Sequence, residues 1–217
     1  MARPNEPEIW DALWSQKNAP EPWFENFDFI KKTYALFHSS APLHSPILDV
    51  GCGRGKFIDY VCSNGSYSGI GADFAYESIK SCSVPAVVAD ACQLPFASST
   101  FSSITSILVI EHVFNYKTFF FEAQRLLKPG GCLYLLFPNF FSMVTPAMKL
   151  KQIQFWKTKE IFYFQPLKQQ EVRHCLEQMG YRIVSTAYLS IGLYLSGLER
   201  FIGCSIGRLL PEKNRSE

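Results

Sequence analysis

The stretch ILDVGCGRG, residues 47–55, decides the fold of this chain. A short apolar run leads directly into Gly-x-Gly-x-Gly, and a helical pattern begins near Lys56. Glycines permit positive φ angles and let the backbone approach a ligand closely, so the pattern is typical of a strand, turn and helix that bind a small molecule. The third glycine comes one residue earlier than in dinucleotide sites, and Asp49 disfavours an anion but favours an ammonium or sulfonium group. Taken alone, the loop could also be a tight turn that binds nothing.

Outward from this loop, short apolar runs alternate with helical patterns. The expected strands are 46–50, 67–72, 86–89, 103–109 and 132–137, and the expected helices between them are 55–64, 75–81 and 117–127. This alternation predicts an α/β fold with a doubly wound, mostly parallel sheet of the Rossmann-like type. A helix near 26–38 should precede this core, and a helix over 169–179 with a strand over 181–187 should follow it.

Composition is that of an ordinary globular protein. The 217 residues are 47% hydrophobic and 18% charged, with 21 basic and 19 acidic side chains. A net charge of +2 provides no overall field to hold a nucleic-acid backbone, which argues against a nucleic-acid partner. The seven cysteines include no C-x-x-C pair, and no apolar run is long enough to span a membrane. These features predict a cytoplasmic protein with reduced thiols and no structural metal.

Two further predicted strands end on acids. Asp73 lies roughly 20 residues after Gly51, the spacing of a carboxylate that accepts hydrogen bonds from ribose hydroxyls. Asp90 follows the next apolar run. Because ligands bind at the carboxyl ends of parallel strands, the glycine loop and these acids predict one ligand site.

These residues resemble the class I S-adenosylmethionine-dependent methyltransferases, specifically their broad small-molecule "type 11" group. The resemblance covers roughly 45–185 and is carried by five motifs: ILDVGCGRGKF (47–57), GIGADF (69–74), VVADACQLPF (87–96), SSITSILVIEHV (102–113) and EAQRLLKPGGCLYLLFPN (122–139). It implies S-adenosyl-L-methionine as the cofactor and methyl transfer as the activity, with O-methylation favoured.

The resemblance also implies which residues would bind the cofactor: Asp49, Gly51, Cys52, Gly53, Gly55, Asp73, Phe74, Asp90, Ala91, Ser106 and Ile107. The glycine loop would wrap the methionine part and Asp49 would hold its amino group. Asp73 would bind the ribose, and Asp90 with the Ala91 N–H would bind the adenine. Phe74 would flank the adenine, while Ser106 and Ile107 would lie beneath the cofactor.

Glu111 and His112 follow the fourth expected strand and are the candidate catalytic residues. His112 could deprotonate a hydroxyl acceptor, since the unperturbed pKa of histidine lies near ~6.5. Both residues could equally begin the next helix and hydrogen-bond locally. The segment also resembles the Glu-x-x-Glu-His of metal-dependent methyltransferases, but Leu108 replaces the first glutamate. We therefore expect no metal. The motif that grips an extruded base is missing from the sequence after this strand, which disfavours base methylation.

The expected organisation is one methyltransferase domain over 1–217. It comprises an N-terminal cap (1–44), a cofactor-binding core (45–139), an acceptor-side cap (140–165) and a C-terminal part (166–217). Aromatic and basic residues mingle in 140–165, which suits a hydrophobic acceptor, an anionic membrane surface, nucleic-acid bases or packing on the core.

The tail over 194–210 has apolar residues at helical spacing, so it predicts an amphipathic helix instead of a seventh strand. This helix would dock on the body, on a second subunit, or weakly on a membrane surface.

The leading hypothesis is therefore a methyltransferase for a small, hydrophobic or lipid-linked acceptor. One alternative is a cofactor-binding or regulatory protein without turnover, and another is an RNA or protein methyltransferase. The sequence specifies neither the acceptor atom nor an oligomeric state.

Overall fold

The computed structural model describes residues 7–15, 27–40, 42–138, 165, 167–195 and 198–211. The strands are β1 (Ile47–Val50), β2 (Gly69–Asp73), β3 (Ala86–Val88), β4 (Phe101–Ile107), β5 (Leu127–Pro138), β6 (Tyr181–Leu195) and β7 (Leu198–Pro211). The described helices are α1 (Pro7–Trp14), α2 (Phe27–Ser40), α3 (Lys56–Gly65), α4 (Tyr76–Ile79), α5 (Tyr116–Leu126) and α7 (Gln169–Gln178). Every strand and helix expected between residues 26 and 187 is present, although β5 and β6 are longer than expected.

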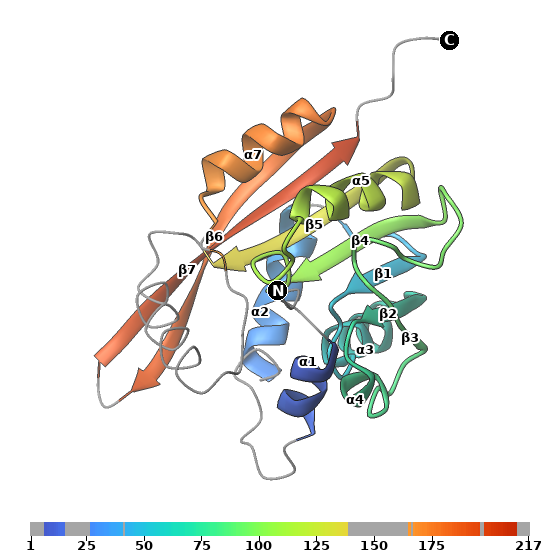
Figure 1. The fold of residues 1–217 in the computed structure, drawn as a ribbon. Coiled ribbons are helices and arrows are strands. Elements are labelled where there is room, and N and C mark those ends of the chain that lie inside the picture. The colour runs from blue at the N-terminus through green and yellow to red at the C-terminus, as the bar shows by residue number, and fades with distance from the viewer. Residues whose placement is uncertain are drawn as a thin grey trace, which may run out of the picture.

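The strands form one sheet in the order β3-β2-β1-β4-β5-β7-β6 (Figure 1). Strands β1 to β5 pair in parallel, and β7 runs antiparallel to both of its neighbours. The mostly parallel, Rossmann-like α/β sheet predicted from the sequence is confirmed. The sheet order reverses direction next to β1, and such a reversal is where ligands bind in open α/β sheets.

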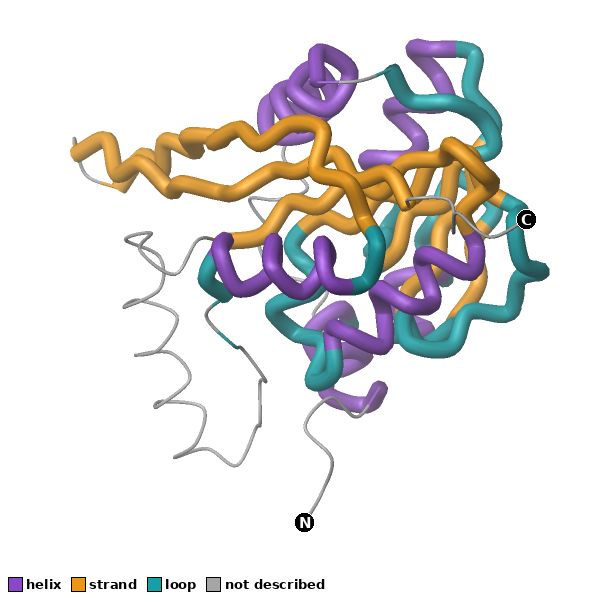
Figure 2. The backbone as a smooth tube through the Cα atoms, turned by 90° about the horizontal axis from the view of Figure 1, so that it is seen from above, coloured by secondary structure: helices purple, strands orange, loops and turns teal. Residues whose placement is uncertain are grey.

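Both faces of the parallel part of the sheet are buried, each by its own set of helices (Figure 2). Along β5, Leu133 and Leu135 face a core that includes α5 and α7. Their neighbours Tyr134 and Leu136 face a core that includes α2 and α3. All four side chains are almost completely buried. Burial on both sides explains why these strands read as nearly continuous apolar runs in the sequence.

The expectation of an amphipathic helix over 194–210 is wrong, because the described part of this segment is strand. β7 pairs with β5 from Leu133↔Leu209 to Pro138↔Cys204, and it pairs with β6 along its length. Gly203 and Gly207 would each weaken a helix by about 1 kcal/mol relative to alanine. Pairing with β5 also covers an edge that would otherwise present unpaired N–H and C=O groups. The seventh strand that the sequence analysis rejected is therefore present. Because the segment forms no helix, the predicted docking of a helix on the body, on a second subunit or on a membrane no longer applies.

The expected acceptor-side cap lies outside the described residues over 140–164, and only its last residue, Gln165, is described. The Gln165 backbone N–H donates a hydrogen bond to the carbonyl of Glu111 at 2.8 Å. Its side-chain Nε2 donates to the carbonyl of Val113 at 2.6 Å. Gln165 thus fixes the segment that follows β4. Within the part of the chain that the structure describes, no helix has the length and apolar character needed to cross a membrane.

Candidate functional site

The glycine loop between β1 and α3 adopts backbone angles that favour glycine. Gly51, Gly53 and Gly55 have φ angles of 72°, 55° and 75°. A Cβ atom at Gly51 would collide with the side chain of Val109, and one at Gly55 would collide with Cys82. Glycine is therefore needed in this loop for two reasons: the positive φ angles, and the lack of space for a side chain at Gly51 and Gly55.

Asp73, the last residue of β2, braces this loop. Its Oδ2 accepts a hydrogen bond from the Gly53 N–H at 2.8 Å, and its Oδ1 accepts one from the Ala75 N–H at 2.9 Å. Burial raises the pKa of the Asp73 carboxyl above its usual value, and these two N–H groups oppose the rise. The expected proximity of Asp73 to the glycine loop is thus confirmed, and Asp73 also has a structural task that the spacing did not reveal.

Asp49 lies in β1 immediately before the loop and is 3% exposed. Its Oδ1 accepts a hydrogen bond from the Thr105 hydroxyl at 2.7 Å. Burial raises the pKa of Asp49 to about 7; the Thr105 hydrogen bond opposes this rise, and the charge of Asp73 adds to it. A cation placed beside Asp49 would favour its ionised form and lower this pKa.

The segment after β4 turns sharply toward the glycine loop. Leu108 has a φ of 58°, which is uncommon for a residue other than glycine, and its N–H donates to the Leu136 carbonyl at 2.7 Å. The turn packs Val109 against Gly51. It therefore brings the two candidate catalytic residues, Glu111 and His112, to the same end of the sheet as the loop.

Glu111 is buried with a side chain that is 2% exposed, and its Oε2 has no hydrogen-bond partner among the described residues. Burial raises the pKa of Glu111 to about 8. The Nε2 atom of His112 lies 3.9 Å from Glu111 Oε1. A buried carboxyl that is neutral near pH 7 beside an imidazole is a pair able to hold or move a proton.

Helix α1 connects the segments that surround the site, a feature that the sequence analysis missed. The Trp10 ring meets the His112 ring edge-on, with centroids 5.2 Å apart. Asp11 Oδ1 accepts a hydrogen bond from the Glu77 N–H at 2.9 Å. The Arg54 guanidinium of the glycine loop lies 5.2 Å from the ring centre of Trp14. The many aromatic residues before residue 44, among them Trp10 and Trp14, were the signal in the sequence that this segment packs on the protein, but they do not show which residues they contact.

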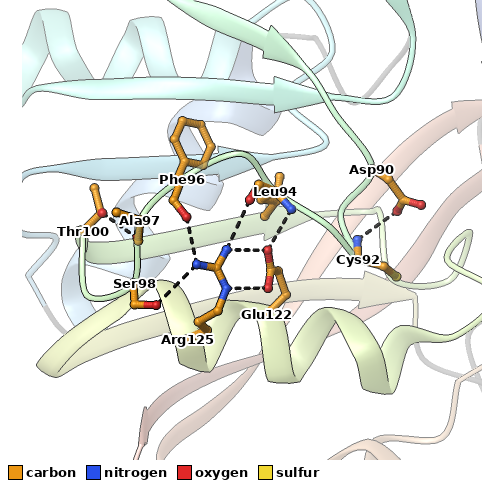
Figure 3. A network of polar contacts seen from close by, with 9 residues as sticks. All are labelled: Asp90, Cys92, Leu94, Phe96, Ala97, Ser98, Thr100, Glu122 and Arg125. Carbon is orange, nitrogen blue, oxygen red and sulfur yellow. Dashed lines mark hydrogen bonds and ion pairs between the residues drawn. The ribbon is translucent and has the colours of Figure 1, made fainter.

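Asp90 begins a turn after β3 and accepts a hydrogen bond from the Cys92 N–H at 2.8 Å (Figure 3). The same connection is held to α5 by Glu122, whose Oε1 accepts a hydrogen bond from the Leu94 N–H at 2.8 Å and pairs within α5 with Arg125 at 2.7 Å. Arg125 also donates to the Leu94 and Phe96 carbonyls, as Figure 3 shows. The network fixes the connection that carries Asp90.

The remaining predicted residues lie along the same end of the sheet. Cys52 sits buried in the glycine loop, and Phe74 follows Asp73. Ala91 follows Asp90, while Ser106 and Ile107 end β4. The structure therefore groups the whole predicted set at the carboxyl ends of β1 to β4. Contacts of these residues with a cofactor remain predictions.

The chemistry of this end of the sheet fits a cationic ligand that carries hydrogen-bond donors. Asp49, Asp73, Asp90 and Glu111 supply acidic groups. The Ser106 Oγ is buried and, like Glu111 Oε2, has no partner among the described residues. Buried oxygens of this kind are costly unless a ligand or water completes their hydrogen bonds.

Comparisons with known proteins agree with this geometry. Residues 48–135 match the sequence model of the family described as "Methyltransferase domain". A tRNA (carboxymethyluridine(34)-5-O)-methyltransferase of Arabidopsis thaliana is 36% identical over 130 residues, which cover 57% of this chain and 30% of that protein. A ubiquinone biosynthesis O-methyltransferase of Rhizobium rhizogenes is 32% identical over 109 residues, covering 45% of this chain and 43% of that protein. The chain spans less than half the length of these relatives.

Solved structures confirm the fold. An S-adenosylmethionine-dependent methyltransferase from Thermotoga maritima is similar with a TM-score of 0.72 and 15% identity, covering 94% of this chain and 99% of that chain. A structure of the Haloferax volcanii Trm112 methyltransferase activator in complex with a methyltransferase gives a TM-score of 0.71 at 14% identity, covering 97% and 99%. Because one sequence relative is named for tRNA, the comparisons do not support the exclusion of nucleic acid that net charge suggested.

Proposed function

We propose that this chain is a class I S-adenosylmethionine-dependent methyltransferase that transfers the methyl group of its cofactor to an oxygen atom of a small, hydrophobic or lipid-linked acceptor. The match of residues 48–135 to the family described as "Methyltransferase domain" supports this proposal. The observation that carries the proposal is the pair of buried Glu111 and partly buried His112 beside the glycine loop. The two relatives described above are both named as O-methyltransferases, which supports oxygen as the acceptor atom.

The residues at the carboxyl ends of the strands suit S-adenosylmethionine. Asp49 would face the ammonium group, and Asp73 would accept hydrogen bonds from the ribose hydroxyls. Asp90 would accept from the adenine amino group. The acidic residues of the site support this fit, as do the two buried oxygens, Ser106 Oγ and Glu111 Oε2, that have no partner in the described part of the chain. When bound, the cofactor supplies a methyl group activated by a sulfonium charge.

The chain's own contribution is to bind, to orient and to move a proton. His112 would take the proton of an acceptor hydroxyl, and the resulting imidazolium would favour ionisation of Glu111 across 3.9 Å. The pair can thus hold one proton between its two members. Trp10 packs edge-on against the imidazole and restricts its orientation. Phe114, two residues further on, is 67% exposed and offers apolar surface near the pair.

A second candidate, methylation of a carboxymethyl group on tRNA, is favoured by the Arabidopsis relative at 36% identity. A carboxylate acceptor is already ionised near pH 7, so it requires no general base. The two candidates therefore differ in their dependence on His112. A phenol-like acceptor needs the imidazole, whereas a carboxylate acceptor does not.

The test is transfer of an isotopically labelled methyl group to a panel of acceptors. The panel holds phenols and catechols with and without isoprenoid tails, carboxylates, and unmodified and carboxymethylated tRNA. We expect label on an aliphatic-tailed phenol and a loss of roughly 100-fold or more in His112→Gln. Glu171→Gln, in an exposed ion pair on α7, serves as a matched control. Label on tRNA alone, with His112→Gln still active, would replace this proposal by the second candidate. Cofactor binding without transfer to any acceptor would favour a protein without turnover.

A further inference from the structure

Two cysteines meet across the glycine loop. Cys52 lies between Gly51 and Gly53 and is 9% exposed, while Cys82 follows α4 and is half-buried. The Cys52 Sγ lies 3.6 Å from the carbonyl oxygen of Gly53, and a hydrogen bond between the two thiols shifts the pKa of each. Both thiols are free in the structure. The sequence showed only that 30 residues separate them, so their contact is a product of the fold.

The Cys82 sulfur packs against Gly55 of the glycine loop, whose N–H donates to the Cys52 carbonyl at 2.9 Å, and the Cys52 sulfur packs against Gly71 of β2. A Cβ at Gly55 would collide with the Cys82 sulfur, and one at Gly71 would meet the Cys52 sulfur at 2.5 Å. The dithiol is therefore packed between the glycine loop and β2. Movement of either sulfur has to be accommodated by the loop or by the turn after α4.

The two thiols are chemically unequal. The hydrogen bond from Cys52 lowers the pKa of Cys82 to about 7, against burial and against the charges of Asp73 and Asp59. Donating that hydrogen bond, together with burial, raises the pKa of Cys52. Cys82 is also the more accessible of the two residues, because it is half-buried whereas Cys52 is 9% exposed. A nucleophilic thiolate beside a buried thiol is the usual arrangement of a reactive and a resolving cysteine.

We propose that Cys52 and Cys82 are an oxidation site that closes into a disulfide in the presence of a hydroperoxide. The Cys82 thiolate attacks one peroxide oxygen, the O–O bond breaks, and a sulfenic acid forms with release of water or an alcohol. The Cys52 sulfur then attacks the sulfenic sulfur, and the hydroxyl group leaves as water with the Cys52 proton. The two thiols lose two electrons, and the hydroperoxide gains them.

Disulfide formation changes the cofactor site. A disulfide holds its sulfurs about 2 Å apart, which is closer than two thiols in hydrogen-bond contact. Cys52 has to move toward Cys82, and its neighbour Gly53 is the residue whose N–H binds Asp73 at 2.8 Å. We therefore expect the oxidised chain to bind S-adenosylmethionine at least about 10-fold more weakly. By linkage, bound cofactor shifts the equilibrium between the dithiol and the disulfide toward the dithiol by the same factor. This consequence rests on the proposed cofactor role of the loop.

The first experiment detects the bond itself. The folded, reduced chain is treated with hydrogen peroxide, alkylated, digested without reductant and mapped by mass spectrometry. We expect a linked pair of peptides that contain Cys52 and Cys82, also in the control variant Cys62→Ser, whose cysteine lies on α3. Cys82→Ser should form no linked pair. Oxidation of other cysteines while Cys52 and Cys82 stay reduced would overturn the proposal.

The second experiment measures the effect on the site. Calorimetric titration compares S-adenosylmethionine affinity of the reduced chain, of the oxidised chain and of the oxidised chain after dithiothreitol. The expected result is the loss given above and full recovery, with no loss in peroxide-treated Cys82→Ser. Equal affinities of the reduced and cross-linked chains would refute the effect on the site. Failure of the reduced chain to bind would instead count against the proposed function, because peptide mapping does not depend on the cofactor.

Discussion

Replacing Asp73 tests whether one carboxylate both braces the glycine loop and binds the cofactor. In Asp73→Ala the N–H groups of Gly53 and Ala75 lose their acceptor, to which they donate at 2.8 and 2.9 Å. Hydrogen bonds to a charged group are worth roughly 1.5–3 kcal/mol each. Relief of the buried charge offsets part of this loss. We therefore expect the free energy of unfolding to fall by about 2–4 kcal/mol.

Cofactor affinity should fall as well, because the same carboxylate would accept hydrogen bonds from the ribose. A loss of roughly 1.5–3 kcal/mol corresponds to about a 10- to 150-fold rise in the dissociation constant. Asp73→Asn keeps one acceptor oxygen and should lie between the alanine variant and the unchanged chain. Glu171→Ala, which removes only an exposed ion pair with Lys168, is the matched control.

The assays are urea unfolding followed by circular dichroism, and calorimetric titration at a temperature where each variant is folded. Unchanged affinity in folded Asp73→Ala would refute the placement of the cofactor at the end of β2. Unchanged stability together with weaker binding would show that the two backbone hydrogen bonds contribute nothing measurable to the loop.

Three further changes test other parts of the site. Burial raises the pKa of Asp49 to about 7, so the folded chain binds more protons than the unfolded chain between about pH 4 and 7. The free energy of unfolding, measured in urea, should therefore fall as pH rises through that range. Cofactor affinity, measured by calorimetry, should rise from pH 6 to 8. Asp49→Asn should reduce the pH dependence of both quantities. Arg125→Ala breaks the network that holds residues 94–98 to α5, and should speed amide exchange there and weaken cofactor binding about 3- to 10-fold, unlike the exposed control Arg173→Ala. Gly53 has a φ of 55°, so Gly53→Val should reduce cofactor affinity by roughly 100-fold or more while circular dichroism still shows a folded chain; normal binding would contradict the loop assignment.

The sequence predicts those parts of the fold in which local and tertiary preferences agree. β1 and the glycine loop are recognisable because the backbone at Gly51 and Gly55 leaves no room for a side chain. The parallel strands are recognisable because burial on both faces demands continuous apolar runs. The sequence did not predict β7 because its apolar residues also fit a helical period. Its pairing with β5 joins residues far apart in the chain, which a local pattern does not reveal.

In the candidate site, too, the sequence predicts the residues whose place follows from a strand and misses the contacts that depend on distant packing. Asp49, Asp73 and Asp90 could be predicted because each stands at or near the end of a strand, where the sheet fixes its place. The contacts of Trp10 with His112 and of Cys52 with Cys82 could not, because they depend on how distant segments pack. The raised pKa values of Asp49 and Glu111 likewise arise from burial, which a single sequence does not display.

Titration of the reduced chain with S-adenosylmethionine tests the central claim most directly. The account predicts one saturable site per chain, with a dissociation constant of roughly 1 μM to 1 mM. It also predicts proton release near pH 7, because a cation beside Asp49 favours the ionised carboxylate; buffers of different ionisation enthalpy reveal this release. A folded chain that shows no saturable binding up to about 10 mM would contradict the account.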